Sequence, residues 1–159
     1  MNTHVDKEKL LKESPSAASI PIFSNAVPMK ILRVRDSVMK YFRPILHKHK
    51  FTEQQWRVMR TLQHSRMGTL QLAKECAIMP SSVSRLTQGL VKRGMIVRDP
   101  SSNLNDLRQV QFMLTEKGSR KIEEIAPQIQ AAYKKIQDKA GEENVKKLLQ
   151  LLEVFIKAL

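Results

Sequence analysis

The chain has 159 residues, of which 42% are apolar, and its formal net charge is +13 at pH 7. This length fits one domain of the usual ~100–200 residues, and the apolar content excludes a wholly disordered chain. No segment approaches the ~20 consecutive apolar residues of a membrane span, so the positive charge indicates double-stranded nucleic acid as the partner, and no membrane.

The start of the chain lacks the apolar stretch of a secretory signal peptide. A single cysteine, Cys76, cannot form an internal disulfide, which is typical of a reducing compartment. Both features predict a cytoplasmic protein. Residues 1–26 are expected to form a flexible arm, because Pro15 and Pro21 favour extended backbone; the apolar residues near its end offer an alternative, docking on the body or on a second subunit.

From residue 28 the apolar residues recur at three- and four-residue steps, which predicts an amphipathic helix over about 28–48. They are Ile31, Val34, Val38, Phe42 and Ile45. Pro44 is expected to kink this helix or to begin its end. Thr52 and Gln55 then have the spacing of a capping box, which predicts a second helix that ends before Met67.

A third helix is expected over about 70–77, with Thr69 as its cap. Pro80 suits the first position of a fourth helix, which runs to about Arg93 and ends at Gly94. Residues 95–115 alternate like two strands around the polar loop 101–105, and Val110, Phe112 and Leu114 share one face. Thr115 should cap a long helix that ends near Gly141, and a broad apolar stripe between 145 and 159 predicts a last helix.

This order predicts a mainly α fold with a small β-hairpin wing. A winged helix-turn-helix covers about 52–118, and the helices over about 28–48 and 116–159 form a dimerisation region. Residues 27–159 would then be a single domain. The last helix either packs on its own core or covers its broad apolar stripe with a second copy of the chain, and we favour the second copy because helix-turn-helix proteins usually bind paired half-sites.

The helix over 80–93 has the composition of a recognition helix, whose first turns enter the major groove. Its short polar and basic side chains are candidates for DNA contacts, whereas Val83, Leu86 and Leu90 should face inward. The candidates are Ser81, Ser82, Ser84, Arg85 and Gln88. Arg85 can bind guanine bidentately. An alternative for Ser81 and Ser82 is that they only cap the helix.

The predicted hairpin adds Arg98, Asp106 and Arg108 to these candidates. Arg108 lies at the start of a strand from which it can reach into the minor groove. Asp106 is unsuited to phosphate but can orient Arg98 or Arg108. A plain surface ion pair is the alternative for these residues.

The chain resembles the MarR family of bacterial repressors over about residues 28–159. The resemblance rests on Leu72-Ala73, Val83-Ser84-Arg85-Leu86, Leu90, Arg93-Gly94, Val97-Arg98, Asp106-x-Arg108 and Leu114-Thr115-x-Lys117-Gly118. The segments 41–44 and 52–57 are similar to the branch that controls aromatic-acid catabolism, such as homoprotocatechuate and hydroxycinnamate regulators. The resemblance implies an obligate homodimer, a palindromic operator and release by a small phenolic ligand. It also assigns Arg108 to the minor groove, with Asp106 as its partner. The loop 101–105 departs from the family's short proline-and-basic tip.

A small aromatic carboxylate needs an apolar slot and a cation, because an unpaired buried charge is costly. The junction of the first two helices offers both, and the family's inducers are expected between the dimerisation helices and the DNA-binding lobe. The candidates are Met39, Arg43, His47, Trp56, Arg57 and Arg60. Arg43 and Arg57 are expected to bind the carboxylate and Trp56 to form the aromatic wall. The alternative is that Met39 and Trp56 are core and the basic residues are solvated.

The sequence predicts no metal site and no cofactor, since His47 and His49 lack partners at metal-ligand spacing. Cys76 is expected to be a small buried apolar residue rather than a redox switch. An enzyme is not expected, because no catalytic triad and no glycine-rich phosphate loop is present. The leading hypothesis is therefore a ligand-responsive repressor of an aromatic catabolic operon. The alternative is an architectural or non-specific nucleic-acid-binding protein, for which the charge of +13 suffices.

Overall fold

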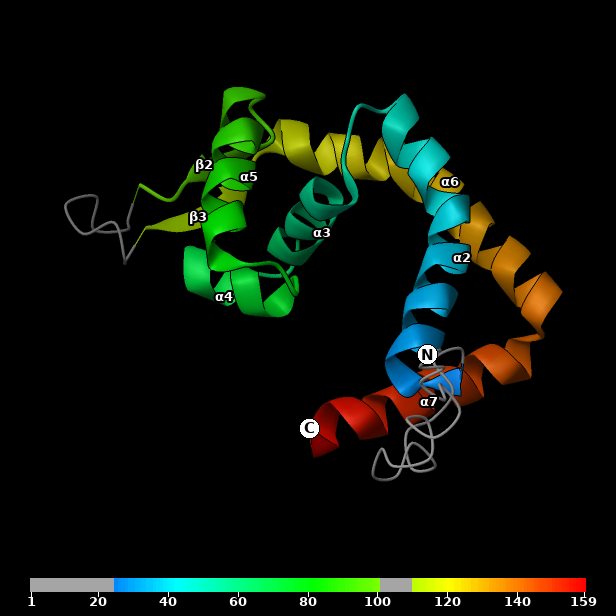
Figure 1. Cartoon of the computed structure of the whole chain (residues 1–159). Coiled ribbons are helices and arrows are strands. Elements are labelled where there is room, and N and C mark those ends of the chain that lie inside the picture. Colours follow the sequence, from blue (N-terminus) through cyan, green and yellow to red (C-terminus); the bar gives the residue numbers. More distant parts are fainter. Residues whose placement is uncertain (1–24, 101–109) are drawn as a thin grey trace, which may run out of the picture. The chain divides into compact units, whose positions relative to one another are not determined.

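The computed structural model describes residues 25–100 and 110–159, and these residues form a mainly helical protein with a small antiparallel sheet (Figure 1). The helices are α2 Val27–Lys48, α3 Glu53–Leu62, α4 Thr69–Glu75, α5 Pro80–Lys92, α6 Glu116–Ala140 and α7 Glu142–Ala158. The strands are β1 Met67–Gly68, β2 Ile96–Arg98 and β3 Gln111–Leu114. The predicted fold class is confirmed. The predicted N-terminal arm and the polar loop 101–105 lie outside the described residues, apart from Asn25 and Ala26.

The chain divides into two compact units, residues 1–38 and 39–159. The described part of the first unit is essentially the N-terminal portion of α2. Most of its large apolar side chains are exposed, including Val27, Ile31 and Val34. The predicted amphipathic face of α2 is therefore buried only further along, where Phe42 packs edge-on against Tyr133 of α6 with ring centroids 4.9 Å apart. Pro44 does not end α2, which continues to Lys48.

The core of the second unit lies between α3, α4, α5, the sheet and the first half of α6. Its fully buried side chains include Val58, Met59, Leu72, Val83, Leu90 and Ile125. The predicted capping box is present, since the Gln55 amide donates to Thr52 Oγ1 and the Thr52 amide donates to Gln55 Oε1, both at 3.1 Å. This cap fixes the start of α3, the first helix of the core of the second unit.

The sheet has the strand order β1-β3-β2. The predicted hairpin corresponds to β2 and β3, in which Ile96 pairs with Leu114 and Arg98 pairs with Phe112. Strand β1 was not predicted and pairs Met67 with Phe112 on the other side of β3. The prediction that Thr69 caps the third helix is wrong. Gly68 occupies that position with no side-chain cap, because Gly68 is held in β1 and the helix begins directly after the strand.

The start of α6 is fitted closely against the turn between α5 and β2. Thr115 caps α6 as predicted, accepting from the Gly118 amide at 3.0 Å, and its hydroxyl also lies within hydrogen-bond distance of the Gly94 and Met95 carbonyls. A side chain at Gly118 would meet the Met95 carbonyl oxygen at 2.1 Å, so only glycine fits at this approach. The wing and α6 are thus joined without a flexible segment.

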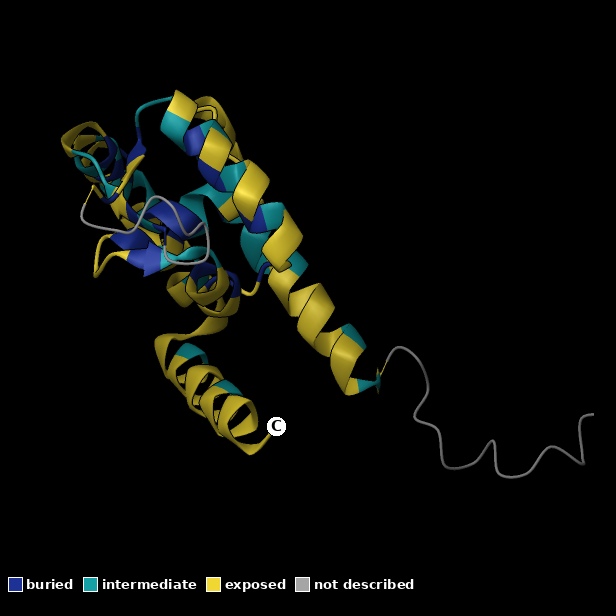
Figure 2. Ribbon diagram, turned by 90° about the vertical axis from the view of Figure 1, so that its left-hand side faces the viewer, coloured by how far each residue is buried: buried dark blue, intermediate teal, exposed yellow. Residues whose placement is uncertain are grey.

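Helix α7 differs from the rest, because none of its residues is buried. In Figure 2 it is drawn almost wholly as exposed surface, whereas the core of the second unit is buried. The large apolar residues exposed on α7 are Leu148, Leu149, Leu151, Val154, Phe155 and Ile156, and Leu159 directly after the helix is exposed as well. Within residues 25–100 and 110–159, most of the predicted apolar stripe is therefore left without cover.

Candidate nucleic-acid interface

Helix α5 separates its apolar and polar residues as a recognition helix requires. Val83, Thr87 and Leu90 are buried, and the Thr87 hydroxyl is satisfied by donating to the Val83 carbonyl at 3.0 Å. The opposite face is polar, with Ser81, Ser84, Arg85 and Gln88 exposed and Ser82 half-buried. Met79 occupies the N-cap without a side-chain cap bond, so the structure gives neither Ser81 nor Ser82 a capping role.

The turn between α4 and α5 is rigidly built. The Ile78 amide donates to the Ala73 carbonyl at 3.0 Å and the Ala77 amide to the Lys74 carbonyl at 3.1 Å, which is the Schellman arrangement of a helix end. Ala77 has the positive φ, +48°, that this arrangement usually assigns to glycine. Arg57 of α3 donates to the Cys76 carbonyl at 2.6 Å. These bonds hold the angle at which α5 leaves α4.

The paired strands β2 and β3, here called the wing stem, bring a further cation to the exposed side of α5. Arg98, at the end of β2, lines a small cavity of about 230 Å³ together with Gln88 and Lys92 of α5, and Phe112 lies beside them. Gln88 and Lys92 are exposed, as is Arg98. The predicted candidate Arg98 is therefore next to the predicted candidate Gln88, whereas Asp106 and Arg108 lie outside the described residues. Gln88, Lys92 and Arg98 thus present polar and basic side chains close together, as binding of a polyanion requires.

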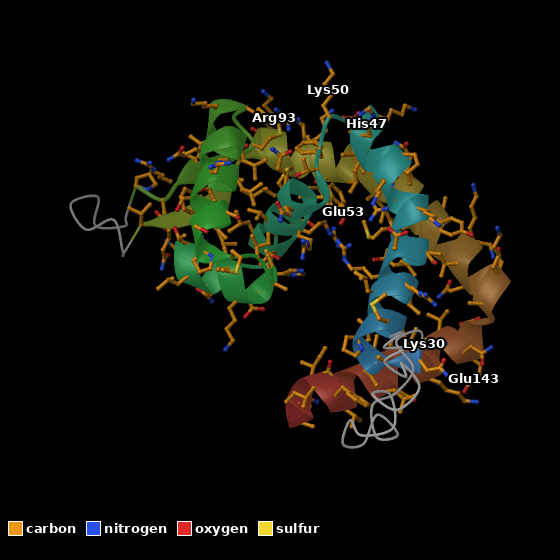
Figure 3. All side chains as sticks on the ribbon, in the orientation of Figure 1. Lys30, His47, Lys50, Glu53, Arg93 and Glu143 are labelled. Atoms are coloured by element: carbon orange, nitrogen blue, oxygen red, sulfur yellow. The ribbon has the colours of Figure 1, made fainter. Side chains whose placement is uncertain are left out.

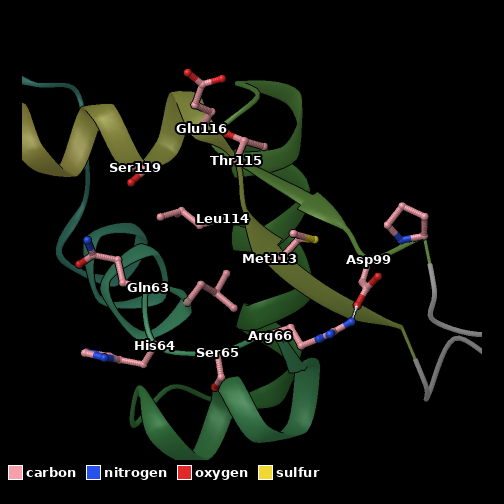
Figure 4. Close-up of a pocket in the computed structure, with 12 residues that line it drawn as sticks. Gln63, His64, Ser65, Arg66, Asp99, Met113, Leu114, Thr115, Glu116 and Ser119 are labelled. Atoms are coloured by element: carbon pink, nitrogen blue, oxygen red, sulfur yellow. Dashed lines mark hydrogen bonds and ion pairs between the residues drawn. The ribbon is translucent and has the colours of Figure 1, made fainter.

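The reverse face of the sheet carries an ion pair that the sequence did not reveal. Arg66, just before β1, donates to the Asp99 carboxylate at 2.6 Å, and Asp99 follows β2 directly (Figure 4). Both residues line a shallow cavity of about 810 Å³, with Met113 and Leu114 of β3 and Glu116 and Ser119 of α6. Asp99 is only 3% exposed, so this is the buried charge of the wing stem.

The C-terminal end of α5 is fixed to the turn between α2 and α3 (Figure 3). Arg93 lies over the ring of Phe51, 4.1 Å from its centroid, and donates to the Lys50 carbonyl at 2.8 Å. The ammonium of Lys117 in α6 donates to the Arg93 carbonyl at 2.9 Å. Arg93 therefore has its partners within the protein.

Residue His49 of the same turn contacts α6. Its Nε2 is 2.9 Å from Gln128 and its Nδ1 is 3.4 Å from Glu124. The hydrogen bond from Lys121 lowers the pKa of the Glu124 carboxyl. Desolvation opposes this effect, and the electrostatic interactions with Lys121 and His49 add to it. Glu124 therefore stays ionised beside the turn.

The predicted ligand residues are only partly brought together. Arg43 of α2 bonds Glu53 at the start of α3 at 2.6 Å, which makes a polar link between the two helices. Arg60 lies 6.0 Å from the centroid of Trp56 and donates to Gln63. Met39 and Trp56 are half-buried and His47 is exposed. Arg57 is separated from this group by its bond to the Cys76 carbonyl.

Cys76 is buried, as expected, and its sulfur lies 3.4 Å from the Thr61 hydroxyl. Over residues 25–100 and 110–159 no group of three or more His, Cys, Asp or Glu side chains is arranged to hold a metal ion. None of the helices described there is both long and apolar enough to cross a membrane.

Comparisons with known proteins identify this arrangement. Residues 51–110 match the model of the MarR family. The homoprotocatechuate degradative operon repressor of Escherichia coli is 32% identical over 133 residues, which are 83% of this chain and 88% of that protein. The HTH-type transcriptional regulator FarR of Neisseria gonorrhoeae is 34% identical over 130 residues, 80% of this chain and 86% of that protein.

Solved structures give the same result. The crystal structure of NadR in complex with 4-hydroxyphenylacetate superposes with a TM-score of 0.75 at 28% identity, covering 84% of this chain and 96% of that one. The family resemblance inferred from the sequence is confirmed, and so is the expectation that the chain is not an enzyme. The chain belongs to the MarR family and is a transcriptional repressor of the type that includes repressors of aromatic catabolic operons.

Proposed function

We propose that this protein binds a palindromic operator as a homodimer in the cytoplasm and leaves it when a small aromatic carboxylate binds. The observation that carries the proposal is the exposed polar face of α5, which presents Ser84, Arg85 and Gln88 and of which Gln88 lines a cavity together with Arg98. Arginine binds the O6 and N7 atoms of guanine bidentately in the major groove, which makes Arg85 the residue that reads sequence. Ser81, Ser82 and Arg98 position the helix on phosphate.

Dimerisation is supported by apolar side chains that stay exposed in the part of the chain that the structure describes. Leu149 and Ile156 of α7 are 62% and 73% exposed and lie seven residues apart, hence on one helix face. The N-terminal part of α2 exposes Val27, Ile31 and Val34. A second copy of the chain covers these faces, because apolar surface of this extent is unusual on a monomer. Two subunits then place their recognition helices ~34 Å apart, one turn of DNA.

The ligand site in this proposal lies where α2 meets α3. The names of the relatives point to aromatic acids, since one represses a homoprotocatechuate operon and another was crystallised with 4-hydroxyphenylacetate. Arg43 is the cation for the carboxylate and Trp56 is the aromatic wall, with Met39, His47 and Arg60 around them, whereas Arg57 is engaged by the Cys76 carbonyl. The ligand carboxylate competes with Glu53 for Arg43, because the Glu53 carboxylate already lies 2.6 Å from the guanidinium.

Competition at Arg43 links ligand binding to DNA binding. Glu53 is in the first turn of α3, the helix that opens the DNA-binding lobe, so displacing it loosens the polar link between α2 and that lobe. The free energy of coupling this requires is modest, about 1–3 kcal/mol in typical allosteric proteins.

The test uses the full chain and a duplex selected by the protein from a random DNA pool. Fluorescence anisotropy should show tight binding to this duplex in excess unlabelled random DNA, and 4-hydroxyphenylacetate or a hydroxycinnamate should release it. The matched control is 4-methylphenol, which keeps the ring and hydroxyl but lacks the carboxylate. Equal affinity for selected and random DNA favours the architectural alternative, which the charge of +13 allows. Release by none of the acids contradicts the ligand part alone.

A further inference from the structure

The wing stem is held by a polar contact on the face of the sheet turned away from α5. Arg66 lies just before β1, and Asp99 just after β2, which are the two outer strands of the sheet. The Arg66 guanidinium reaches the Asp99 carboxylate at 2.6 Å and so ties the outer strands together across β3 (Figure 4). The Asp99 amide donates to the Gln111 carbonyl at 2.8 Å, which fixes the same residue through its backbone.

The alternation of side chains in a strand connects this ion pair to the DNA-facing side. Successive residues point to opposite faces, so fixing Asp99 on one face fixes Arg98 on the other. Arg98 indeed lines the cavity beside Gln88 and Lys92 of α5, whereas Asp99 lines the cavity beside Met113 and Leu114. Arg98 is exposed and Asp99 is buried, which matches this division.

We infer that the Arg66–Asp99 ion pair is a positioning device for DNA binding that sets the direction of Arg98 beside the recognition helix. The inference rests on the proposed contact between Arg98 and DNA. Arg66 and Asp99 do not touch DNA in this account. They act through the end of β2, and a buried carboxylate bonded to a guanidinium is suited to this because the charge-assisted bond holds one geometry.

The Arg66–Asp99 pair differs in position and burial from the ion pairs within single helices. Arg120–Glu116, Lys134–Asp138 and Lys157–Glu153 join residues four apart on a single helix and are largely exposed. Such pairs contribute little to stability. Arg66 and Asp99 are 33 residues apart in the chain and join two strands, and the carboxylate is buried. Only this geometry lets the pair control where another strand residue points.

The test is a double-mutant cycle on DNA affinity with the selected duplex. The variants are Asp99→Asn, Arg66→Gln and both together, with Lys134→Gln as a control that loses one exposed positive charge elsewhere. Each single variant should weaken binding about tenfold, the loss of one charge-assisted contact, and the double variant should be no weaker than either. Lys134→Gln should leave the affinity nearly unchanged. Thermal unfolding of each variant records whether the fold is kept.

A second cycle with Arg98→Ala separates positioning from direct contact. In the Arg98→Ala background, Arg66→Gln should cost no further affinity, because there is no side chain left to position. If Arg66 instead binds phosphate itself, Arg66→Gln weakens binding additively and Asp99→Asn leaves it unchanged or tighter, which overturns the inference. If Asp99→Asn does not fold, the Arg66→Gln and Arg98→Ala cycle still decides the question, since the Arg66 side chain is 60% exposed and its replacement spares the core.

The same measurements distinguish failure of this inference from failure of the proposed function. Loss of affinity in Arg98→Ala alone supports the proposed contact of the wing stem with DNA. Full affinity in Arg98→Ala contradicts that contact and with it the positioning role. Loss in Arg98→Ala together with wild-type affinity in Arg66→Gln and Asp99→Asn retains the contact and overturns the positioning role alone.

Discussion

Helices α5 and α7 are both amphipathic, but they differ in the burial of their apolar residues. The apolar side of α5 is completed within the chain, where Val83 and Leu90 are fully buried and the polar side remains exposed. No residue of α7 is buried, and its exposed residues include Leu149 and Ile156. The same pattern of apolar residues thus serves two ends. In α5 the apolar residues pack the helix on the core, whereas in α7 they remain exposed.

This difference distinguishes a helix whose packing is complete within one chain, α5, from a helix whose apolar face we expect a second copy to cover, α7. The lobe around α5 has its own core, so its stability should not depend on association. The face of α7 gains its cover only in the dimer that we propose, so it should matter for oligomeric state and for DNA affinity. The following predictions test this division, from the largest expected effect to the smallest.

The largest effect is expected in the core under the recognition helix. Leu90→Ala should lower the free energy of unfolding by about 2–5 kcal/mol, because it leaves a cavity beneath α5. The loss should be the same at low and high protein concentration. Leu149→Ala is the matched control on α7, and its effect on the apparent free energy of unfolding should vary with protein concentration, as binding linkage requires. Urea titrations at two concentrations measure both. A concentration-independent effect of Leu149→Ala would count against the division.

The next effect concerns the face of α7. A double change, Leu149→Glu with Ile156→Glu, places two charges on an apolar interface and should give monomers, because burying unpaired charge is costly. Affinity for the selected duplex should fall on the order of a hundredfold, since each monomer keeps only one half-site. Sedimentation velocity and anisotropy measure the two quantities. Gln150→Glu, on the polar side of α7, is the control and should change neither. A dimer that survives the double change would place the interface elsewhere.

A smaller effect is expected at the reading surface. Arg85→Ala should cost about 1–3 kcal/mol on the selected duplex and much less on random DNA, because only a base contact depends on sequence. Lys134→Ala removes a positive charge far along α6 and should affect both duplexes slightly and equally. Equal losses on both duplexes for Arg85→Ala would assign this residue to phosphate instead of a base.

The smallest effect is expected where α2 meets α3. Glu53→Gln removes the carboxylate that occupies Arg43 and keeps the side-chain shape. Because partly exposed ion pairs contribute about 0.2–1 kcal/mol, the affinity for 4-hydroxyphenylacetate should rise by a few-fold at most. Isothermal titration calorimetry measures it, with Glu123→Gln of α6 as the control. Weaker ligand binding in Glu53→Gln would exclude the competition at Arg43.

The sequence predicted those elements whose signals are local. The capping box of Thr52 and Gln55, the cap Thr115 and the start of α5 at Pro80 all follow from contacts within a few residues of each other. Strand β1 was not predicted because its two residues, Met67 and Gly68, are too few for any periodicity to appear. The failure of Thr69 as a cap follows from the same strand, which holds Gly68 at the N-cap.

Contacts between distant segments could not be predicted from the sequence. The Arg66–Asp99 pair depends on the register of three strands, and nothing near Arg66 indicates it. The bond from Arg57 to the Cys76 carbonyl also joins distant segments and was not predicted. The sequence analysis expected Arg57 to bind a ligand, whereas the fold directs its guanidinium to the end of α4. By contrast, Arg85, Ser84 and Gln88 were identified correctly as an exposed face, because helical periodicity alone determines which residues share a side of α5.

Hydroxyl-radical footprinting on the selected duplex tests the central claim most directly. A dimer that reads paired half-sites through α5 should protect two equivalent segments related by two-fold symmetry, with centres about one helical turn apart. The protection should disappear from both segments together in the Leu149→Glu, Ile156→Glu variant. A single unsymmetrical footprint, or protection that is equal on random DNA, would contradict the account.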